Sequence, residues 1–441
     1  MGFFDRIFKK STALHSTPNI RFGRYSDSYK AEAQYDLWDN ALNLFEEGDY
    51  IAAYRSFFQY LLDEKEDNVQ YWQSEGELRF QLFQGSKKIT GVANERQIKA
   101  EAKIAHSEGL KVPFLQRLLQ QNFDLKYSRF ALDEANNLTI KFDSFTIDGS
   151  PYKLYYALKE LAISADKQDD LLIDEFRVLR PVETDHLVPL PKEEQKTKYN
   201  FIVQQIEKTF NIIDKGSLDP QKYPGAIAYL LLDLIYKLDY LTKPEGFTME
   251  TLERIHRYYF SNDGKDTTSK INLIRESLNA LAQRPQEAFF KEMYEVKSTF
   301  GITNPVGHER VVSFIDGELS NMDWYYEQGQ LDYALAIPGY IVGYCLFNYA
   351  LPKPDRDLFH LYYQIVECAY FRQLNISCPY YDAATQRLQK RQIMKAIKRI
   401  IEKHLPNYPD MNPNFSLIKM DNLPLFAKSF LQMVRALKLI K

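Results

Sequence analysis

The chain has few cysteines, and they are poorly placed for a disulfide framework. Only three of its 441 residues are cysteine, and Cys345, Cys368 and Cys378 all lie in the last quarter. Three cysteines are too few to stabilise a chain of this length by disulfides. No two of them are spaced as closely as in a zinc site or a redox motif. We therefore expect buried thiols and a reducing, cytoplasmic location.

The chain also lacks a net charge of either sign and any catalytic signature. Its 56 basic and 59 acidic residues nearly cancel, so no global field favours nucleic acid or an anionic surface. There is no glycine-rich phosphate loop, no nucleophile elbow and no kinase signature. These absences weaken enzyme hypotheses without excluding them, and we expect no cofactor.

A long apolar run is missing as well. No residue between Asp332 and Lys353 is charged, but Pro338, Gly339 and four tyrosines dilute the segment. A membrane span would be a nearly continuous run of about 20 apolar residues. The segment therefore predicts a buried helix.

The N-terminal extension, residues 1–26, begins with an aromatic segment that is not a secretory signal, because Asp5 and Arg6 interrupt its apolar positions. Wound as a helix, Phe3, Phe4, Ile7 and Phe8 would share one side. Such a segment could rest on a membrane surface. The simpler interpretation is that it docks on its own fold or on a partner, or frays.

What the sequence does contain is ample apolar material, 45% of its residues, for packed cores. Residues 27–62 predict a helical hairpin with a turn at Gly48-Asp49. Its apolar and small residues have the spacing of one tetratricopeptide unit: Leu37, Ala41, Leu44, Gly48, Tyr50, Ala53 and Phe57. Because a lone unit cannot stack on copies of itself, we expect the hairpin to pack on the sheet that follows.

Alternating apolar and polar residues predict strands at 78–82, 88–94 and 98–104. Pro113 then opens a helix that runs through Gln121. Two further strands, 125–132 and 138–142, flank a turn at 133–137. Pro151 starts a leucine-rich helix that ends near Phe176. The prediction is an antiparallel sheet of five strands with one solvated face.

This order of helix, three strands, helix, two strands and helix, over residues 37–176, resembles the small α+β domain of type III secretion chaperones and of the YbjN-like proteins. The leucine-rich helix with Asp169-Asp170-Leu171-Leu172 and Phe176 is similar to the closing helix of the YbjN-like family. The resemblance implies a protein-binding domain, often dimeric, at residues 27–176. The N-terminal lead-in and everything after Phe176 depart from the family pattern.

Residues 177–197, which contain Pro181, Pro189 and Pro191, are predicted to be a linker. After the linker, residues 198–441 predict an all-helical bundle or short helical-repeat domain. A weak internal repeat relates about 201–283 to about 314–400, each copy with a glycine turn, Leu-Asp and then Pro-Gly at the start of an apolar helix. The matching positions include Phe201, Gly216, Leu218, Pro224 and Ile227 in the first copy and Phe314, Gly329, Leu331, Pro338 and Ile341 in the second. Chance similarity between two amphipathic stretches explains the match equally well.

Two carboxylate–imidazole pairs are weak candidates for metal ligands. Glu253 and His256 stand three apart on a predicted helix, as do Asp357 and His360. Helical bundles hold two metal ions with pairs at this spacing, but they also need a glutamate from each of two further helices. Acidic residues are frequent enough here to explain both pairs by chance.

One predicted helix near the C-terminus carries a basic stripe interleaved with isoleucines. Its cationic residues are Arg387, Lys390, Arg391, Lys395, Lys398, Arg399 and Lys403. Such a stripe could bind an acidic partner, a phosphate backbone or anionic lipid, although most charge runs are simply solvated faces.

Together these features favour a non-enzymatic, protein-binding, chaperone-like or adaptor protein whose partner is another protein or a second copy of the chain. One alternative is an enzyme with a metal site in the helical half. The other is a peripheral membrane protein attached through Phe3, Phe4 and the basic helix.

Overall fold

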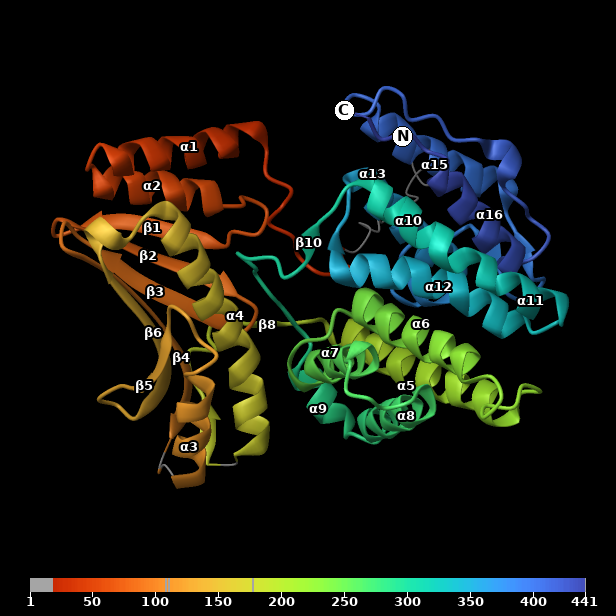
Figure 1. Ribbon diagram of the computed structural model, residues 1–441, viewed down its shortest axis with the longest axis horizontal. Coiled ribbons are helices and arrows are strands. Elements are labelled where there is room, and N and C mark those ends of the chain that lie inside the picture. The colour runs from red at the N-terminus through yellow and green to blue at the C-terminus, as the bar shows by residue number, and fades with distance from the viewer. Residues whose placement is uncertain (1–18, 108, 110–111, 177, 441) are drawn as a thin grey trace, which may run out of the picture. The chain divides into compact units, whose positions relative to one another are not determined.

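The computed structural model describes residues 19–107, 109, 112–176 and 178–440. Figure 1 labels its helices and strands. The chain divides into two compact units. The larger unit runs from Gly23 to Pro352, and the smaller comprises residues 19–22 with 353–440. The predicted class, an antiparallel α+β part followed by a mostly helical part, is confirmed. The division between units differs from the predicted one, since it falls at residues 352 and 353 and not at 177–197.

The larger unit opens with a helical hairpin and a seven-stranded antiparallel sheet. The helices are α1 (Glu32–Glu46) and α2 (Tyr50–Leu61), with Gly48 in the left-handed region at the turn. The strands are β1 (Val69–Ser74), β2 (Glu77–Gln84), β3 (Lys87–Ala93), β4 (Gln97–Ser107), β5 (Arg129–Leu132), β6 (Asn137–Phe145) and β7 (Leu179–Pro181). Their order is β1-β2-β3-β4-β6-β5, and β7 pairs with the end of β4.

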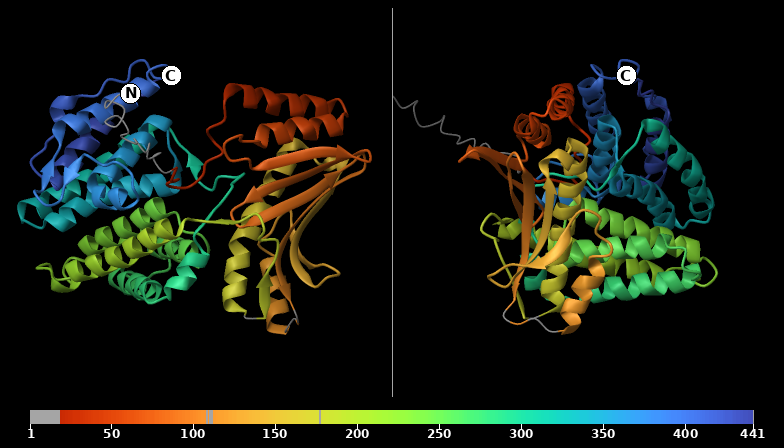
Figure 2. Two further views of the ribbon diagram at one scale, coloured as in Figure 1. Left: turned by 180° about the vertical axis from the view of Figure 1, so that it is seen from behind. Right: turned by 60° about the vertical axis from the view of Figure 1, so that its left-hand side comes forward.

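One face of this sheet is the core of the α+β part. Buried and exposed residues alternate along β4, as expected for a half-buried strand. Helix α4 (Pro151–Glu175) lies on the buried face, as the turned view in Figure 2 shows. Ser150 caps α4 by accepting a hydrogen bond from the Lys153 amide, and Pro151 occupies its first turn. Phe57, Phe58 and Leu158 fill the space between helices and sheet.

The rest of the larger unit is helical. Its helices are α5 (Lys192–Lys215), α6 (Pro224–Thr242), α7 (Gly246–Phe260), α8 (Thr267–Ala282), α9 (Gln286–Lys291), α10 (His308–Glu318), α11 (Met322–Glu327) and α12 (Leu331–Asn348). Two short ribbons join them, β8 (Val188–Pro189) with β9 (Tyr294–Glu295) and β10 (Asn304–Pro305) with β11 (Tyr349–Ala350). Helices α6 and α12 are buried on nearly all sides and pack against each other.

The smaller unit is built on α13 (Lys353–Val366), which packs against α15 (Lys390–His404) and α16 (Leu423–Arg435). Between them lie the short α14 (Cys368–Gln373) and a ribbon of β12 (Tyr381–Asp382) and β13 (Arg387–Leu388). Three short 3-10 turns complete the chain: η1 (Thr146–Asp148), η2 (Leu319–Asn321) and η3 (Phe415–Leu417).

Several finer predictions differ from the structure. The sheet has seven strands instead of five, because β1 shows no clean alternation and β7 lies in the predicted linker. Helix α5 also begins inside that linker, at Lys192. In the first repeat copy Pro224 starts α6, but in the second Pro338 lies inside α12. The second copy, 314–400, also crosses the boundary between the units.

The end of the predicted N-terminal extension is part of the larger unit. The Gly23 amide donates to the Tyr240 carbonyl at 2.9 Å. Gly23 has a φ of +73°, and a Cβ there would lie 2.5 Å from the Tyr240 ring. Only glycine fits this approach without strain. The aromatic positions Phe3 and Phe4 lie outside the described residues.

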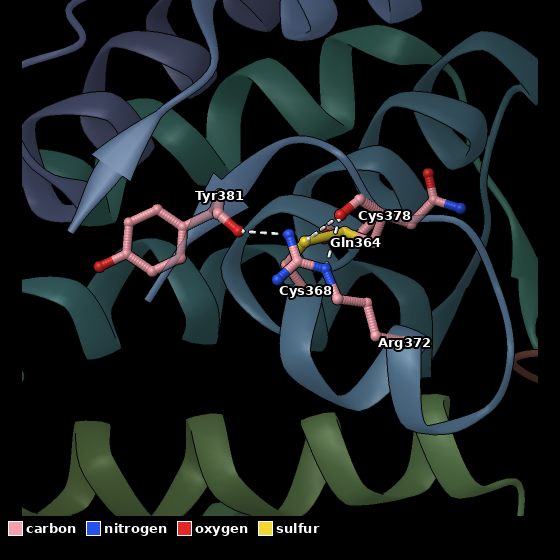
Figure 3. The surroundings of a disulfide bond; sticks show 5 residues. All are labelled: Gln364, Cys368, Arg372, Cys378 and Tyr381. Carbon is pink, nitrogen blue, oxygen red and sulfur yellow. Dashed lines mark hydrogen bonds between the residues drawn. A yellow bond between two sulfur atoms is a disulfide. The ribbon is translucent and has the colours of Figure 1, made fainter. Parts of the chain in front are cut away.

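The prediction of buried thiols is wrong for two of the three cysteines. Cys368 and Cys378 form a disulfide (Figure 3). The turn after α14 brings their Cα atoms to 5.5 Å, a separation that a disulfide spans. Arg372 holds this turn, since its Nε donates to the Cys378 carbonyl and its Nη2 to the Tyr381 carbonyl, both at 2.9 Å. Cys345 is buried and forms no disulfide, as expected.

The uncharged segment between Asp332 and Lys353 forms the buried helix α12, as predicted. Over the described ranges, no helix has the length and apolarity needed to cross a membrane.

Candidate functional site

The strongest candidate for a binding surface is an apolar face on α3 (Val112–Gln121) that the described residues leave exposed. Leu118 points into the core and is only 7% exposed. The adjoining side of the helix presents Val112, Leu115 and Leu119, and Phe123 follows in the next turn. Their exposures are 66%, 40%, 64% and 91%. Because they are spaced by three and four residues, they lie on one side. We call these four residues the α3 face.

Helix α3 lies at the end of the α+β part away from the α1–α2 hairpin (Figures 1 and 2). Polar contacts fix the chain that follows it. Asn122 accepts a hydrogen bond from the Phe130 amide at 2.7 Å. The Glu160 carboxylate on α4 accepts from the amides of 126, 127 and 128 and from the Ser128 hydroxyl, at 2.7 to 2.9 Å. Burial acts to raise the pKa of Glu160, but these donors lower it below its ordinary value.

The chemistry of the α3 face suits binding and not catalysis. Its four side chains contain no titratable or nucleophilic group. Covering each of them would be worth roughly 1.5–3 kcal/mol at full burial. Single exposed apolar residues need no explanation, but a contiguous group of them marks an interaction surface.

A second feature of the larger unit is a buried charge cluster around Arg24, which precedes α1. Its Nε and Nη2 donate to the two carboxylate oxygens of Asp239 on α6, at 3.0 and 2.6 Å. Nη1 donates to Glu253 on α7 at 2.8 Å. Lys167 on α4 extends the cluster to Glu250 at 3.0 Å. The cluster therefore joins three helices and the segment before α1.

The ionisation of this cluster follows from its burial and pairing. Burial acts to lower the pKa of Arg24, but the carboxylates of Asp239 and Glu253 raise it above its ordinary value. Burial raises the pKa of Asp239 even though Arg24 opposes the shift. For Glu253, burial is outweighed by Arg24 and Lys167, so its pKa is lowered. An ion cluster with each carboxylate matched by a cation is a structural element.

The four predicted metal ligands fall in different settings. Glu253 and His256 lie on α7 in the larger unit, and Asp357 and His360 on α13 in the smaller. Glu253 is engaged by Arg24. His256 Nδ1 lies 2.8 Å from the Tyr236 hydroxyl.

Asp357 is paired in a similar way. Its Oδ2 accepts from Lys403 at 2.6 Å and lies 2.8 Å from His404 Nε2. Burial lowers the pKa of His360 to about 4. Within the part of the chain that the structure describes, no three His, Cys, Asp or Glu side chains converge as metal ligands would.

The basic stripe lies on α15, except that Arg387 is in β13 and not on the helix. Ile393, Ile397 and Ile401 are buried on the opposite side. The exposed cations are Arg387, Lys390, Arg391, Lys395, Lys398, Arg399 and Lys403. Lys403 pairs with Asp357, and Lys398 lies 5.7 Å from the centre of the Phe415 ring.

Sequence reasoning missed both the α3 face and the Arg24 cluster. The spacing of Val112, Leu115, Leu119 and Phe123 could have revealed the first, since together with Leu118 they cover a wider arc of the helix than the buried side alone. The second has no local signal, because Arg24 and Asp239 are 215 residues apart.

No protein-family model matches this chain, and comparison with curated proteins finds no relative.

Proposed function

We propose that this chain is a non-enzymatic, chaperone-like or adaptor protein that binds another protein through the α3 face. The observation that carries the proposal is the exposure of Leu119 and Phe123, at 64% and 91%. These side chains lie beside a loop that Glu160 and Asn122 hold in place, so they face outward from an ordered position. The resemblance of residues 37–176 to chaperone-like α+β domains supports the same proposal.

The partner is another protein or a second copy of this chain. A second copy would place two α3 faces against each other in an isologous contact. A different protein would offer its own apolar segment. Either partner would bury the same four side chains, so one variant of the α3 face and one control variant test both possibilities.

The test compares wild-type protein with the double variant Leu119→Asp/Phe123→Ser. Both positions are exposed, so the fold should tolerate the change. Phe145→Ser is the matched control, because Phe145 is 71% exposed and lies at the other end of β6, outside the α3 face. Light scattering gives the oligomeric state, and affinity purification from the native cell identifies a stoichiometric partner, whose binding is then measured with purified components.

We expect wild type and Phe145→Ser to bind and the double variant to lose at least tenfold in affinity, or to become monomeric if the partner is a second copy. Undiminished binding by the double variant would remove the α3 face as the contact surface. A monomeric wild type that purifies alone would contradict protein binding altogether.

A cytoplasmic location stays a proposal, and the argument for it from free thiols no longer holds for two of the three cysteines. It was predicted partly from thiols, but Cys368 and Cys378 form a disulfide. Rapid alkylation of thiols in intact cells, followed by mass spectrometry, would report the state of this pair in its own compartment. A fully alkylated pair would support a reducing compartment.

The peripheral membrane alternative has a specific observation in its favour, the exposed cations of α15. Three of its four isoleucines are buried, so α15 could contact a membrane through charge but not by inserting an apolar face. Flotation of the full chain with anionic vesicles, with and without residues 1–10, separates this alternative from protein binding. Failure to float in either form would eliminate it.

A further inference from the structure

The larger unit contains a cavity of about 240 Å³ beside the Arg24 cluster. It lies where residues 24–25, the end of β2, α4, the α6–α7 junction and the segment 296–302 meet. Ile163, Met249 and Phe300 form part of an apolar wall. A water molecule occupies about 30 Å³ in the liquid, so the cavity corresponds to roughly eight waters. A small organic ligand of about that many non-hydrogen atoms would fill it.

Two polar groups at this cavity, the Nε2 of Gln84 and the hydroxyl of Ser298, have no hydrogen-bond partner among the described residues. The Gln84 residue is 7% exposed, and its Oε1 accepts from the amides of Thr299 and Phe300 at 3.2 and 3.0 Å. Its Nε2 must therefore point away from those amides, and it has no acceptor among the described residues. Ser298 is 8% exposed, and its hydroxyl likewise has no partner in the described chain. Both groups are therefore available to a ligand in the cavity.

The cavity also contains a carboxylate, Asp166, that forms no ion pair with a described residue, although Lys87 lies near enough to act on it electrostatically. Asp166 on α4 accepts a hydrogen bond from the Ser86 amide at 2.8 Å, an approach that depends on Gly85, where a Cβ would lie 1.9 Å from Asp166 Oδ1. No described cation forms an ion pair with Asp166, whereas its neighbour Asp169 pairs with Lys87 at 2.8 Å. Burial and the carboxylates of Glu245 and Asp169 raise the pKa of Asp166 well above its ordinary value. A ligand cation would relieve this excess of negative charge.

One cation at the cavity is equally unpaired. Lys243 ends α6 in a left-handed conformation, and its side chain makes no ion pair or hydrogen bond with the described residues. The other cations at the cavity are already engaged, Arg24 by Asp239 and Glu253 and Lys167 by Glu250. The lining thus offers an acidic and a basic side chain that form no ion pair with described residues, two hydrogen-bonding groups and an apolar wall. Glu245 also lines the cavity and has a partner of its own.

We propose that this cavity binds a small zwitterion with an apolar side chain, of the α-amino acid class. The ligand ammonium pairs with Asp166, and its carboxylate pairs with Lys243 and accepts from Gln84 Nε2 or Ser298 Oγ. The apolar side chain lies against Met249 and Phe300. This site does not involve the α3 face, so its test is independent of the proposed function.

Three matched probes test the proposal by titration calorimetry on the full chain. L-Leucine carries both charges, isopentylamine lacks the carboxylate, and 4-methylpentanoate lacks the ammonium. We expect leucine to bind at least tenfold more tightly than either single-charge analogue. Binding of isopentylamine or 4-methylpentanoate as tight as that of leucine, or no leucine binding up to millimolar concentration, would overturn the proposal.

Two variants assign the charges. Asp166→Asn should lower leucine and isopentylamine affinity at least tenfold, and Lys243→Gln should lower leucine affinity at least tenfold while leaving isopentylamine unchanged. Circular dichroism checks that each variant is folded. If Asp166→Asn does not fold, Lys243→Gln alone decides, because the half-buried Lys243 makes no described side-chain contact that its loss would break. Leucine binding unchanged in Lys243→Gln would overturn the proposal.

Discussion

The guanidinium of Arg24 binds both carboxylate oxygens of Asp239, at 3.0 and 2.6 Å, although 215 residues separate the two in the sequence. Their side chains are 11% and 6% exposed. Because the pair is buried, it replaces water for both groups, and Glu253 completes the shell of the guanidinium at 2.8 Å. The contact fixes the segment before α1 to the helical part of the larger unit.

Removing Arg24 alone should lower the free energy of unfolding by more than the intact ion pair contributes to it. Arg24→Met leaves Asp239 and Glu253 buried without their shared partner, and we expect the free energy of unfolding to fall by about 3–5 kcal/mol. Urea unfolding followed by tryptophan fluorescence measures the change. Adding Asp239→Asn to Arg24→Met should recover part of the loss, since it removes one uncompensated charge.

The control is an exposed ion pair of the same type. Arg129 and Asp143 are 55% and 47% exposed, so Arg129→Met should cost less than about 1 kcal/mol. Equal losses at Arg24 and Arg129 would mean that burial of the Arg24 pair does not determine its energetics.

The second prediction concerns two helical glycines, whose replacement by alanine should change the stability in opposite directions. Gly339 lies in α12, and a Cβ there would stand 2.2 Å from Asp233 Oδ1 on α6. Asp233 is 9% exposed and pairs with Lys237 at 3.1 Å. Gly339→Ala must therefore displace this carboxylate or separate the helices, and we expect a loss of about 1–3 kcal/mol.

Gly317→Ala should have the opposite effect. Gly317 lies in α10, and a Cβ there would meet no atom within 4 Å. Alanine should then stabilise the helix by about 0.5–1 kcal/mol. Thermal unfolding of both variants checks the pair, and destabilisation by Gly317→Ala as large as that by Gly339→Ala would contradict the close α6–α12 approach.

Local periodicity accounts for most of what could be predicted about the fold. Leu78, Phe80 and Leu82 alternate with polar residues because one face of β2 is buried, and Pro151 marks the start of α4. Strand β1 was missed because an edge strand buries little: only Val69 is fully buried, and Trp72 is 46% exposed. Such a strand carries no period of two.

Long-range pairing accounts for most of what could not be predicted. The sequence around Arg24 does not differ from that around any exposed arginine, so its partners on α6 and α7 are visible only in three dimensions. The Cys368–Cys378 disulfide depends on the turn after α14. The candidate metal pairs had the right spacing, but Glu253 and Asp357 are held by cations that the spacing could not reveal.

The third prediction concerns stability at acid pH. Burial, helped by Arg24, lowers the pKa of His256 to about 4. In the folded protein the ring is neutral beside Tyr236 and Phe260, whereas in the unfolded chain it titrates near 6.5. This difference in pKa contributes fully to the free energy of unfolding above pH 6.5, and the contribution is lost as the pH falls from 6.5 through 4.

We therefore expect the free energy of unfolding to decrease from pH 7.5 to pH 4, with about 1–2 kcal/mol of the decrease due to His256, after allowance for its partial exposure. His256→Gln keeps a hydrogen-bonding group but does not titrate, so it should reduce the pH dependence by that amount. The difference between variant and wild type at pH 7.5 gives the structural cost of the substitution. A constant difference across the range would mean that His256 does not contribute.

The fourth prediction concerns the disulfide, which closes a short loop because Cys368 and Cys378 are ten residues apart. Cross-linking a loop of this length restricts the unfolded chain and should stabilise the smaller unit by roughly 2–3 kcal/mol. A reductant should therefore lower its melting temperature. Arg372 still bonds to the carbonyls of Cys378 and Tyr381, so we expect the reduced unit to stay folded at moderate temperature.

Two variants separate this effect from a general action of the reductant. Cys368→Ser/Cys378→Ser should melt at the reduced temperature whether or not reductant is present, because it has no bond to break. Cys345→Ala should keep the full sensitivity, since Cys345 is not part of the disulfide. Denaturing alkylation of the oxidised wild type should label Cys345 alone. Labelling of all three cysteines would show that the bond does not form, and the lower melting temperature would then have to come from another cause.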